Sequence, residues 1–385
     1  MAMNGGIEEF RIAFGQQAID DLHRRIDATR WPDVGWDTGW GTGTHDGVLR
    51  ELINYWRNDY DWFRWEERVN EAGRHVRVQT DDTSELTHAV IYEPPAGVER
   101  KPFPLLLIHG WPGSILEFLN AAPVLASAGY TVITPSLPGF AWSDVVREPG
   151  LHPAMIARRL ASLMTTLGYT KYGVQGGDWG SVIGRTLSTQ FSSEVVGLHL
   201  NFGTATPVPA GQEPTQDETD YLAYRAAWEP EETAYMRQQG TRPQTLGYGL
   251  TDSPVGLMAW ILEKFWAWSD HDDNDLSLWE YVDKDEMITN VMIYWLTGRV
   301  TSAARIYYEM THVSADERAV YAEVVTVPTA YAKFPAEPFA PPREMMERSV
   351  NLVQFSEHEA GGHFAAFEQP DTFARDVISF FDTLS

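Results

Sequence analysis

The sequence contains no cysteine among its 385 residues. Disulfide bonds, thiolate nucleophiles and cysteine-ligated metals are therefore excluded. Basic residues are scarce as well, because 29 lysines and arginines stand against 54 acidic residues, for a net charge of -25. Such a surface repels nucleic acid and anionic membranes. No run reaches the roughly 18 apolar residues of a membrane helix, so the sequence predicts a cytoplasmic protein without a nucleic-acid or membrane partner.

The remaining composition is that of a globular protein, with 43% apolar and 22% charged residues. The length suits one large domain with an elaboration, or two domains. The acidic run at 270–275 is predicted to be a solvated loop, with a metal site as the weaker alternative. Neither a metal nor an organic cofactor is expected, and a homodimer is left open.

Strands and helices alternate along two stretches of the chain. The apolar run Leu105–Ile108 suits a strand buried on both faces of a parallel sheet. Further strands are predicted at 130–134, 171–175, 195–200, 324–331 and 351–355, with helices from 114 to 128, at 153–167 and from 371. This alternation predicts an α/β fold with its site at the carboxyl ends of the strands.

Two other stretches interrupt this pattern. The N-terminal residues contain predicted helices at 16–29 and 46–56 and strands at 75–80 and 86–92. A mostly helical segment rich in Trp and Tyr lies between the sheet strands, as expected of a lid. The sequence predicts four units, namely an extension (1–97), the first part of the core (98–202), a helical cap (203–322) and the second part of the core (323–385).

The segment 176–181, Gly-Gly-Asp-Trp-Gly-Ser, directly follows a predicted strand. Small residues around a sharp strand-to-helix turn are typical of a nucleophile elbow, which usually presents a serine. Here the exposed side chain is the carboxylate of Asp178. A carboxylate nucleophile forms an alkyl ester, so the electrophile is expected to be a saturated carbon. A glycine-rich turn with a helix-capping aspartate is the alternative if the motif stands alone.

A base and its partner acid should follow the nucleophile, each after a late strand. His363, in the glycine-rich segment 361–364, is the best base among 11 histidines, because His358 lies in a sequence that looks solvated. Glu337 is the best acid, with Glu359 as the alternative. Hydrolysis of an ester also needs donors to the oxyanion, and the backbone amides of Trp111 and Trp179 are the candidates.

Three motifs together resemble the microsomal and juvenile-hormone type of epoxide hydrolase. They are His-Gly-Trp-Pro at 109–112, the elbow at 176–181 and Gly-Gly-His-Phe-Ala-Ala-Phe-Glu at 361–368. The resemblance runs from about residue 7 to the C-terminus and implies an α/β-hydrolase fold with an N-terminal extension and a helical cap. Family members hold the epoxide oxygen with two cap tyrosines, which similar segments place at Tyr235 and Tyr307. Adjacent helical residues point about 100° apart, so either Tyr307 or its neighbour Tyr308 faces the site.

The resemblance implies a two-step reaction with a small epoxide and water as the only partners. Asp178 attacks an epoxide carbon, and His363, oriented by Glu337, activates the water that hydrolyses the ester. Family members act in detoxification, on terpenoid hormones and in natural-product biosynthesis. Aromatic residues in the helical segment suggest a bulky apolar or aromatic epoxide, although such residues are more often core. These residues are Trp260, Phe265, Trp266, Trp268 and Trp279.

Two other functions compete with epoxide hydrolysis. A haloalkane dehalogenase also uses an aspartate nucleophile, but it binds halide through nitrogen donors rather than phenols. A non-catalytic binding protein on the same fold would have no need for an intact nucleophile, acid, base and tyrosine pair. A serine esterase is disfavoured, because the elbow carries Asp178 and Ser181 lies three residues too late.

Overall fold

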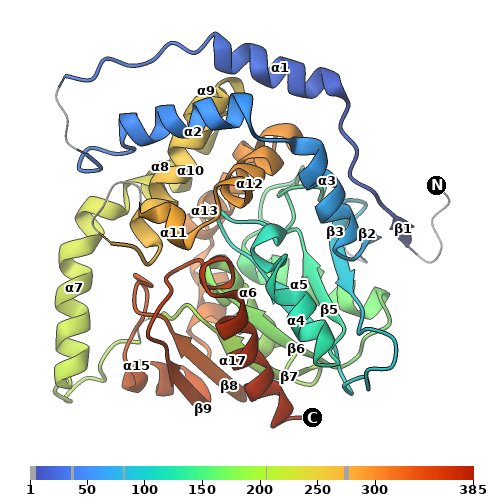
Figure 1. Ribbon diagram of the computed structural model, residues 1–385. Coiled ribbons are helices and arrows are strands. Elements are labelled where there is room, and N and C mark those ends of the chain that lie inside the picture. Colours follow the sequence, from blue (N-terminus) through green and yellow to red (C-terminus); the bar gives the residue numbers. More distant parts are fainter. Residues whose placement is uncertain (1–5, 36–38, 81–82, 205, 273–276) are drawn as a thin grey trace.

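The computed structural model describes residues 6–35, 39–80, 83–204, 206–272 and 277–385. Within these residues, nine strands form one sheet in the order β1-β2-β3-β5-β4-β6-β7-β8-β9 (Figure 1). The strands are β1 Ile7–Glu9, β2 Arg74–Gln79, β3 Leu86–Tyr92, β4 Leu105–Ile108, β5 Val132–Pro135, β6 Tyr172–Gly176, β7 Val195–Leu200, β8 Val325–Lys333 and β9 Val350–Glu357. Neighbouring strands from β5 to β9 are parallel, which confirms the predicted α/β sheet.

The three N-terminal strands extend this sheet instead of forming one of their own. They pair antiparallel with one another, and β3 pairs antiparallel with β5, with Ile91 opposite Ile133. On the other side of β5, Ile133 lies in parallel register with Leu106 of β4. All four residues of β4 are buried. The N-terminal residues and the parallel strands therefore share one continuous core.

Helices cover both faces of the parallel strands. Their bounds are η1 Ile115–Phe118, α4 Ala121–Ser127, α5 Pro153–Thr166, α6 Asp178–Gln190, α15 Arg343–Glu347, α16 Ala365–Glu368 and α17 Pro370–Asp382. Space at Gly173 of β6 is filled by Phe381 of α17, whereas the next residue, Val174, lies against Gly184 of α6. Successive strand residues point to opposite faces, so α17 and α6 lie on opposite sides of the sheet.

A helical segment, residues 216–322, is inserted between β7 and β8 (Figure 1). It consists of α7 Gln216–Glu232, α8 Ala234–Thr241, α9 Pro243–Asp252, α10 Pro254–Trp268, α11 Leu278–Tyr281, α12 Lys284–Thr297, α13 Val300–Thr311, α14 Ala315–Arg318 and η2 Ala319–Ala322. Helices α10 and α12 are buried along most of their length. This segment therefore contributes to the main core rather than lying loosely on it.

The N-terminal helices α1 Gln16–Asp27, α2 Asp46–Asn58 and α3 Trp62–Glu71 lie across the helical segment (Figure 1). The Tyr55 hydroxyl donates to Asp285 Oδ1 at 2.7 Å, and the Trp65 indole donates to Asp285 Oδ2 at 3.2 Å. The Tyr60 hydroxyl lies 2.9 Å from Thr289 Oγ1. The extension thus joins the edge of the sheet to the top of the helical segment.

Some elements differ from the prediction. Helix α3 and strand β1 were not predicted, although Trp62, Trp65 and Val69 have the spacing of one helical face. The helix predicted from 114 to 128 is broken after the turn η1, and α4 then begins with Pro123 in its first turn, where its missing N–H is tolerated. Helix α6 begins at Asp178, within the segment 176–181 predicted as a strand-to-helix turn.

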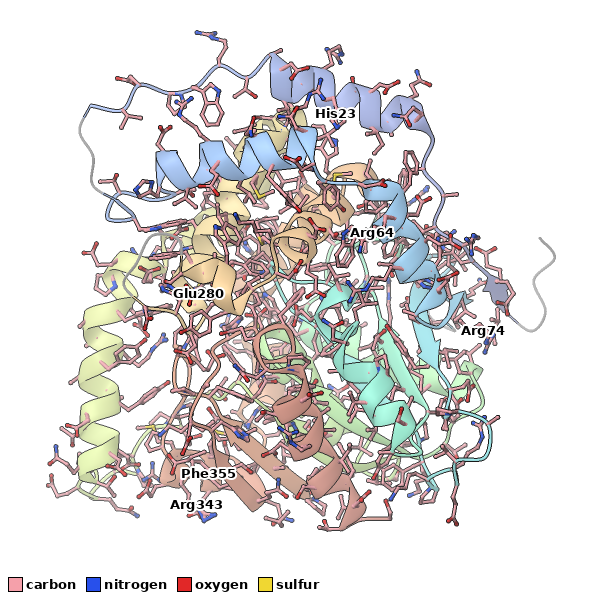
Figure 2. The ribbon with its side chains drawn as sticks, viewed as in Figure 1. His23, Arg64, Arg74, Glu280, Arg343 and Phe355 are labelled. Carbon is pink, nitrogen blue, oxygen red and sulfur yellow. The ribbon has the colours of Figure 1, made fainter. Side chains whose placement is uncertain are left out.

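Arg74 and Arg343 lie at the edge of the molecule in Figure 2, and Arg64 is also exposed. In the described part of the chain, no helix combines the length and the apolar character needed to cross a membrane.

Candidate active site

Asp178 occupies the turn between β6 and α6. Its φ of 47° is positive, a conformation that non-glycine residues adopt at a cost and that is common at active sites. A Cβ on Gly180 would lie 1.9 Å from the Ile108 carbonyl oxygen, and one on Gly176 would lie 2.2 Å from the Gly180 oxygen. The glycines are therefore required by backbone contact. The resulting turn places the Asp178 carboxylate at a helix N-terminus, which favours a negative charge.

The two carboxylate oxygens of Asp178 have different neighbours. Oδ1 accepts a hydrogen bond from the backbone N–H of Trp111 at 2.7 Å. Oδ2 lies 3.5 Å from Nε2 of His363. The Trp179 amide lies in the first turn of α6, where backbone N–H groups have no partner within the helix. One oxygen is thus held by an amide, and the other faces the histidine.

His363 lies between two carboxylates. Its Nδ1 is 2.8 Å from Glu337 Oε2, and Glu337 Oε1 accepts from the Phe339 amide at 2.8 Å. Because the buried Glu337 accepts, Nδ1 carries a proton and Nε2 is the site that titrates. Burial lowers the pKa of His363, but Glu337 and then Asp178 outweigh it, so the pKa is raised well above its ordinary value.

The loop that carries His363 is also fixed by the helical segment. The His363 amide donates to the Trp268 carbonyl oxygen at 2.8 Å, and the Gly361 amide donates to Asp270 Oδ2 at 2.8 Å. Glu368 in turn accepts from the Asp270 amide at 2.7 Å. The acidic run at 270–275 was predicted as a solvated loop; Asp270 is instead half-buried and structural, and residues 273–276 lie outside the described part. Among the described residues, no His, Asp and Glu cluster could hold a metal ion.

Two buried tyrosines approach Asp178 from the helical segment. The ring of Tyr235 on α8 stacks on Trp111 at 5.2 Å between centroids, and Tyr307 on α13 meets Trp179 edge to face at 4.8 Å. The two tyrosine rings are 5.8 Å apart. Burial raises the pKa of both phenols well above the ordinary value, and the charge of Asp178 adds to it. Both phenols are therefore protonated hydrogen-bond donors near the nucleophile.

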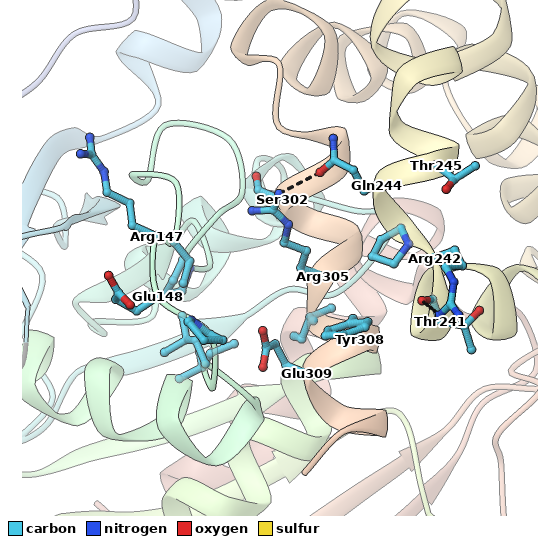
Figure 3. A pocket seen from close by; sticks show the side chains of 17 residues that line it. Arg147, Glu148, Thr241, Arg242, Gln244, Thr245, Ser302, Arg305, Tyr308 and Glu309 are labelled. Carbon is cyan, nitrogen blue, oxygen red and sulfur yellow. Dashed lines mark hydrogen bonds between the residues drawn. The ribbon is translucent and has the colours of Figure 1, made fainter.

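Tyr308 points elsewhere. It stacks on His312 at 3.9 Å and lines a separate pocket of about 500 Å³ on the other side of α13. Figure 3 shows Tyr308 there with Arg147, Arg242 and Arg305. The geometry thus places Tyr307, rather than Tyr308, beside the nucleophile.

Comparison with known proteins identifies the family and the fold. Residues 7–118 match the model "Epoxide hydrolase N terminus", and residues 104–228 match the model "alpha/beta hydrolase fold". A Stigmatella aurantiaca protein named as an epoxide hydrolase is 38% identical over 98% of this chain and 86% of its own length. Epoxide hydrolase 1 of Sus scrofa is 33% identical over 100% of this chain and 90% of its own length.

The chain belongs to the epoxide hydrolase family. The crystal structure of juvenile hormone epoxide hydrolase from the silkworm Bombyx mori superimposes with a TM-score of 0.88, at 33% identity, over 98% of this chain and 94% of that one. The resemblance seen in the sequence and the α/β-hydrolase fold are confirmed. The protein is an enzyme, an epoxide hydrolase that acts on an ether bond, rather than a dehalogenase or a binding protein.

Most aromatic residues proposed from the sequence to form the pocket have other contacts in this epoxide hydrolase. Trp268 packs against both Tyr235 and His363, at 5.2 and 4.9 Å between centroids. Phe265 stacks on Phe364 and Trp266 on Trp40. The remaining two contact polar groups, since Trp260 donates to Gln239 and Trp279 packs against Lys284. Only Trp268, of these five, contacts the described groups around Asp178.

The alternatives to His363 and Glu337 lie away from the epoxide hydrolase site. Glu359 is exposed, and Nε2 of His358 lies 3.1 Å from Asp376 Oδ2. His358 is therefore half-buried and paired, although its sequence context looks solvated. The contact of His358 with Asp376 does not involve Asp178.

The loop that supplies the Trp111 amide depends on a neutral histidine. His109 Nε2 accepts from the Leu137 amide at 3.1 Å, so the proton lies on Nδ1, which donates to the Gly110 oxygen at 2.9 Å. Burial lowers the pKa of His109 to about 4. The epoxide hydrolase therefore keeps this side chain uncharged at neutral pH.

Three polar residues near Asp178 were missed from the sequence, namely Glu117, Gln175 and Asn201. Glu117 of η1 and Gln175 of β6 line a small cavity with Asp178 and His363. Glu117 is the single acid in the apolar run 115–119, a signal that could have identified it. Gln175 is a buried amide within an otherwise apolar or glycine-containing strand, and no local pattern distinguishes it.

Proposed function

We propose that this enzyme converts an apolar epoxide to a vicinal diol through a covalent ester on Asp178. The observation that carries the proposal is the arrangement of the Asp178 carboxylate, with the Trp111 amide on Oδ1 and His363, backed by Glu337, near Oδ2. This is the geometry of a nucleophile with an oxyanion donor and a separate base.

In the first step, Oδ2 of Asp178 attacks one epoxide carbon, and the bond from that carbon to the ring oxygen breaks. Tyr235 and Tyr307 donate hydrogen bonds to the ring oxygen, and one phenol transfers its proton to the developing alkoxide. The product is a hydroxyalkyl ester and a phenolate. Oδ1 becomes the ester carbonyl oxygen, which the Trp111 amide already contacts.

In the second step, water attacks the ester carbon of Asp178 and gives a proton to Nε2 of His363. The Trp111 amide, with that of Trp179, stabilises the oxyanion. The bond between the ester carbon and the alkyl oxygen then breaks, and the diol oxygen takes the proton from His363. Asp178 is left as a carboxylic acid, whose proton returns to the phenolate, so the sum is epoxide plus water to diol.

Ester formation also prepares His363 for its role as a base. In the free enzyme the charge of Asp178 helps to raise the pKa of His363. Esterification removes that charge, so the pKa falls and Nε2 can accept a proton from water. The first step therefore switches on the base for the second.

The surroundings of Asp178 support an apolar, bulky or aromatic epoxide. The rings of Trp111, Trp179, Tyr235, Tyr307 and Trp268 meet one another around it. We propose that residues 203–322 form the cap that supplies the tyrosines, over a core of residues 98–202 and 323–385 with the extension at 1–97. Detoxification or natural-product biosynthesis would use such an enzyme.

The test is a single turnover of styrene oxide by excess enzyme in oxygen-18 water, with mass spectrometry of the diol and of the peptide that contains Asp178. The ester route predicts label in Asp178 and none in the first diol. Label directly in the diol would mean that water attacks the epoxide, which would refute the nucleophilic role. Asp178→Asn is the control, for which no ester is expected.

A further inference from the structure

A small cavity lies next to the nucleophile, away from the two tyrosines. Its volume is about 10 Å³, near the minimum space needed for one water molecule. Its polar lining comes from Glu117, Gln175, Asp178, Asn201 and His363. The tyrosines do not line it, so it is distinct from the space for the epoxide oxygen. A polar cavity of this size suits a single bound water.

One lining group lacks a partner of its own. Gln175 is 1% exposed, and its Nε2 donates to Asn201 Oδ1 at 2.8 Å. That bond fixes the orientation of the amide, so Oε1 points the other way. Oε1 is buried and has no hydrogen-bond partner among the described residues. Buried carbonyl oxygens without a protein partner are commonly satisfied by water.

Glu117 is placed against the cavity by the glycine loop before it. A Cβ on Gly113 would lie 1.5 Å from Glu117 Oε1, so the side chain occupies the space that this glycine leaves. Burial, opposed by His363 and assisted by Asp178, raises the pKa of Glu117 to about 8. At neutral pH the group is then mainly the neutral acid, which carries an O–H donor.

We propose that this cavity is the site of the hydrolytic water, and that Glu117 and Gln175 hold this water beside His363. This inference rests on the proposed ester mechanism. The two O–H bonds of the water point to His363 Nε2 and Gln175 Oε1. The Glu117 acid donates to one lone pair, which leaves the second lone pair for the ester carbon of Asp178.

This assignment separates the two steps in space. The epoxide reacts on the side of the tyrosines, whereas the water waits on the side of His363. A bulky substrate can then fill its own space without displacing the water. Because the water contacts matter only after the ester has formed, loss of Glu117 or Gln175 should slow hydrolysis and leave alkylation unchanged.

The experiment is rapid-quench intact-mass spectrometry with styrene oxide, which measures ester formation and ester loss separately. Glu117→Leu removes the donor at similar volume and should slow ester loss at least tenfold, with alkylation within twofold of wild type. Glu117→Gln keeps an N–H donor, so its rate of ester hydrolysis should be within threefold of the wild-type rate. Glu286, another buried glutamate, bonds to Asn120 away from the cavity, so Glu286→Gln should change neither step.

Unchanged ester loss in Glu117→Leu would overturn the water site. If that variant does not fold, Gln175→Met carries the same test, with slow ester loss expected and unchanged ester loss refuting the site. His363→Gln separates this inference from the mechanism beneath it. If the ester accumulates in His363→Gln but is hydrolysed at the normal rate in the cavity variants, only the water site is refuted. If no ester forms in any variant, the covalent mechanism itself is refuted.

Discussion

Acid is expected to destabilise this enzyme through His109, which the fold keeps neutral beside the Trp111 amide. The ordinary pKa of histidine is about 6.5, and burial lowers that of His109 to about 4. Between these values the folded state binds fewer protons than the unfolded state, so the free energy of unfolding falls as the pH falls. From about pH 7.5 to about pH 5, the loss from this one group is roughly 2 kcal/mol.

Other buried groups also change the free energy of unfolding over this pH range, and some of them lower it in acid whereas others raise it. The pKa of His88 is lowered well below its ordinary value by burial, which adds to the acid sensitivity. Burial raises the pKa of Glu117 and of Glu368 to about 8, so these carboxyls favour the folded state as the pH falls from about 8 towards about 4.5. The pH dependence of the free energy of unfolding is therefore the sum of these contributions, and a variant of His109 is needed to isolate the part due to this residue.

The assay is urea unfolding at about pH 7.5 and about pH 5 for wild type, His109→Gln and the surface control His312→Gln. His109→Gln should be less stable than wild type at neutral pH, because it disturbs the hydrogen bonds to Leu137 and Gly110. Between the two pH values, however, its free energy of unfolding should fall by roughly 2 kcal/mol less than that of wild type. His312→Gln should follow wild type. A constant difference between His109→Gln and wild type at both pH values would refute the neutral, buried assignment.

Three further predictions concern the individual steps. His363→Gln should still be alkylated but should accumulate the ester, and intact-mass spectrometry without an adduct would contradict its role as the base. Tyr235→Phe and Tyr307→Phe should each slow alkylation by roughly 10²-fold, because each removes a donor to the ring oxygen; a fully active double variant, tested in single-turnover kinetics, would mean that other donors act. Glu337→Gln should slow ester hydrolysis by roughly 10²-fold, measured as ester lifetime, and unchanged turnover would assign the orienting role elsewhere.

The parts of the site that could be predicted from the sequence are those written in local patterns. Asp178 lies in a turn whose glycines are needed for close backbone contact. The strand, the turn and the helix therefore follow one another in a single recognisable sequence pattern. His363 and Glu337 follow late strands, and the fold brings their side chains to within 2.8 Å. Tyr235 and Tyr307 were proposed only through the family resemblance, because helical spacing alone does not distinguish them from core tyrosines.

The parts that could not be predicted depend on contacts between distant segments. Glu117 and Gln175 line one cavity although η1 and β6 are far apart in the sequence, and neither segment carries a motif for water binding. Asp270 lies in an acidic run whose composition indicates solvent, yet one carboxylate oxygen bonds to the Gly361 amide. Single residues with a distant partner cannot be recognised by composition, which averages over their neighbours.

The contacts of Asp270 also bear on how the two steps are coordinated. The loop with His363 is bonded to the helical segment through Trp268, Asp270 and Glu368. The same segment supplies Tyr235, whose ring packs on Trp268. A shift of this segment would therefore move the donors of the first step and the base of the second together. Such a shift would misplace both sets of groups at once, so we infer that the helical segment must be docked for both alkylation and hydrolysis, and not only to exclude solvent.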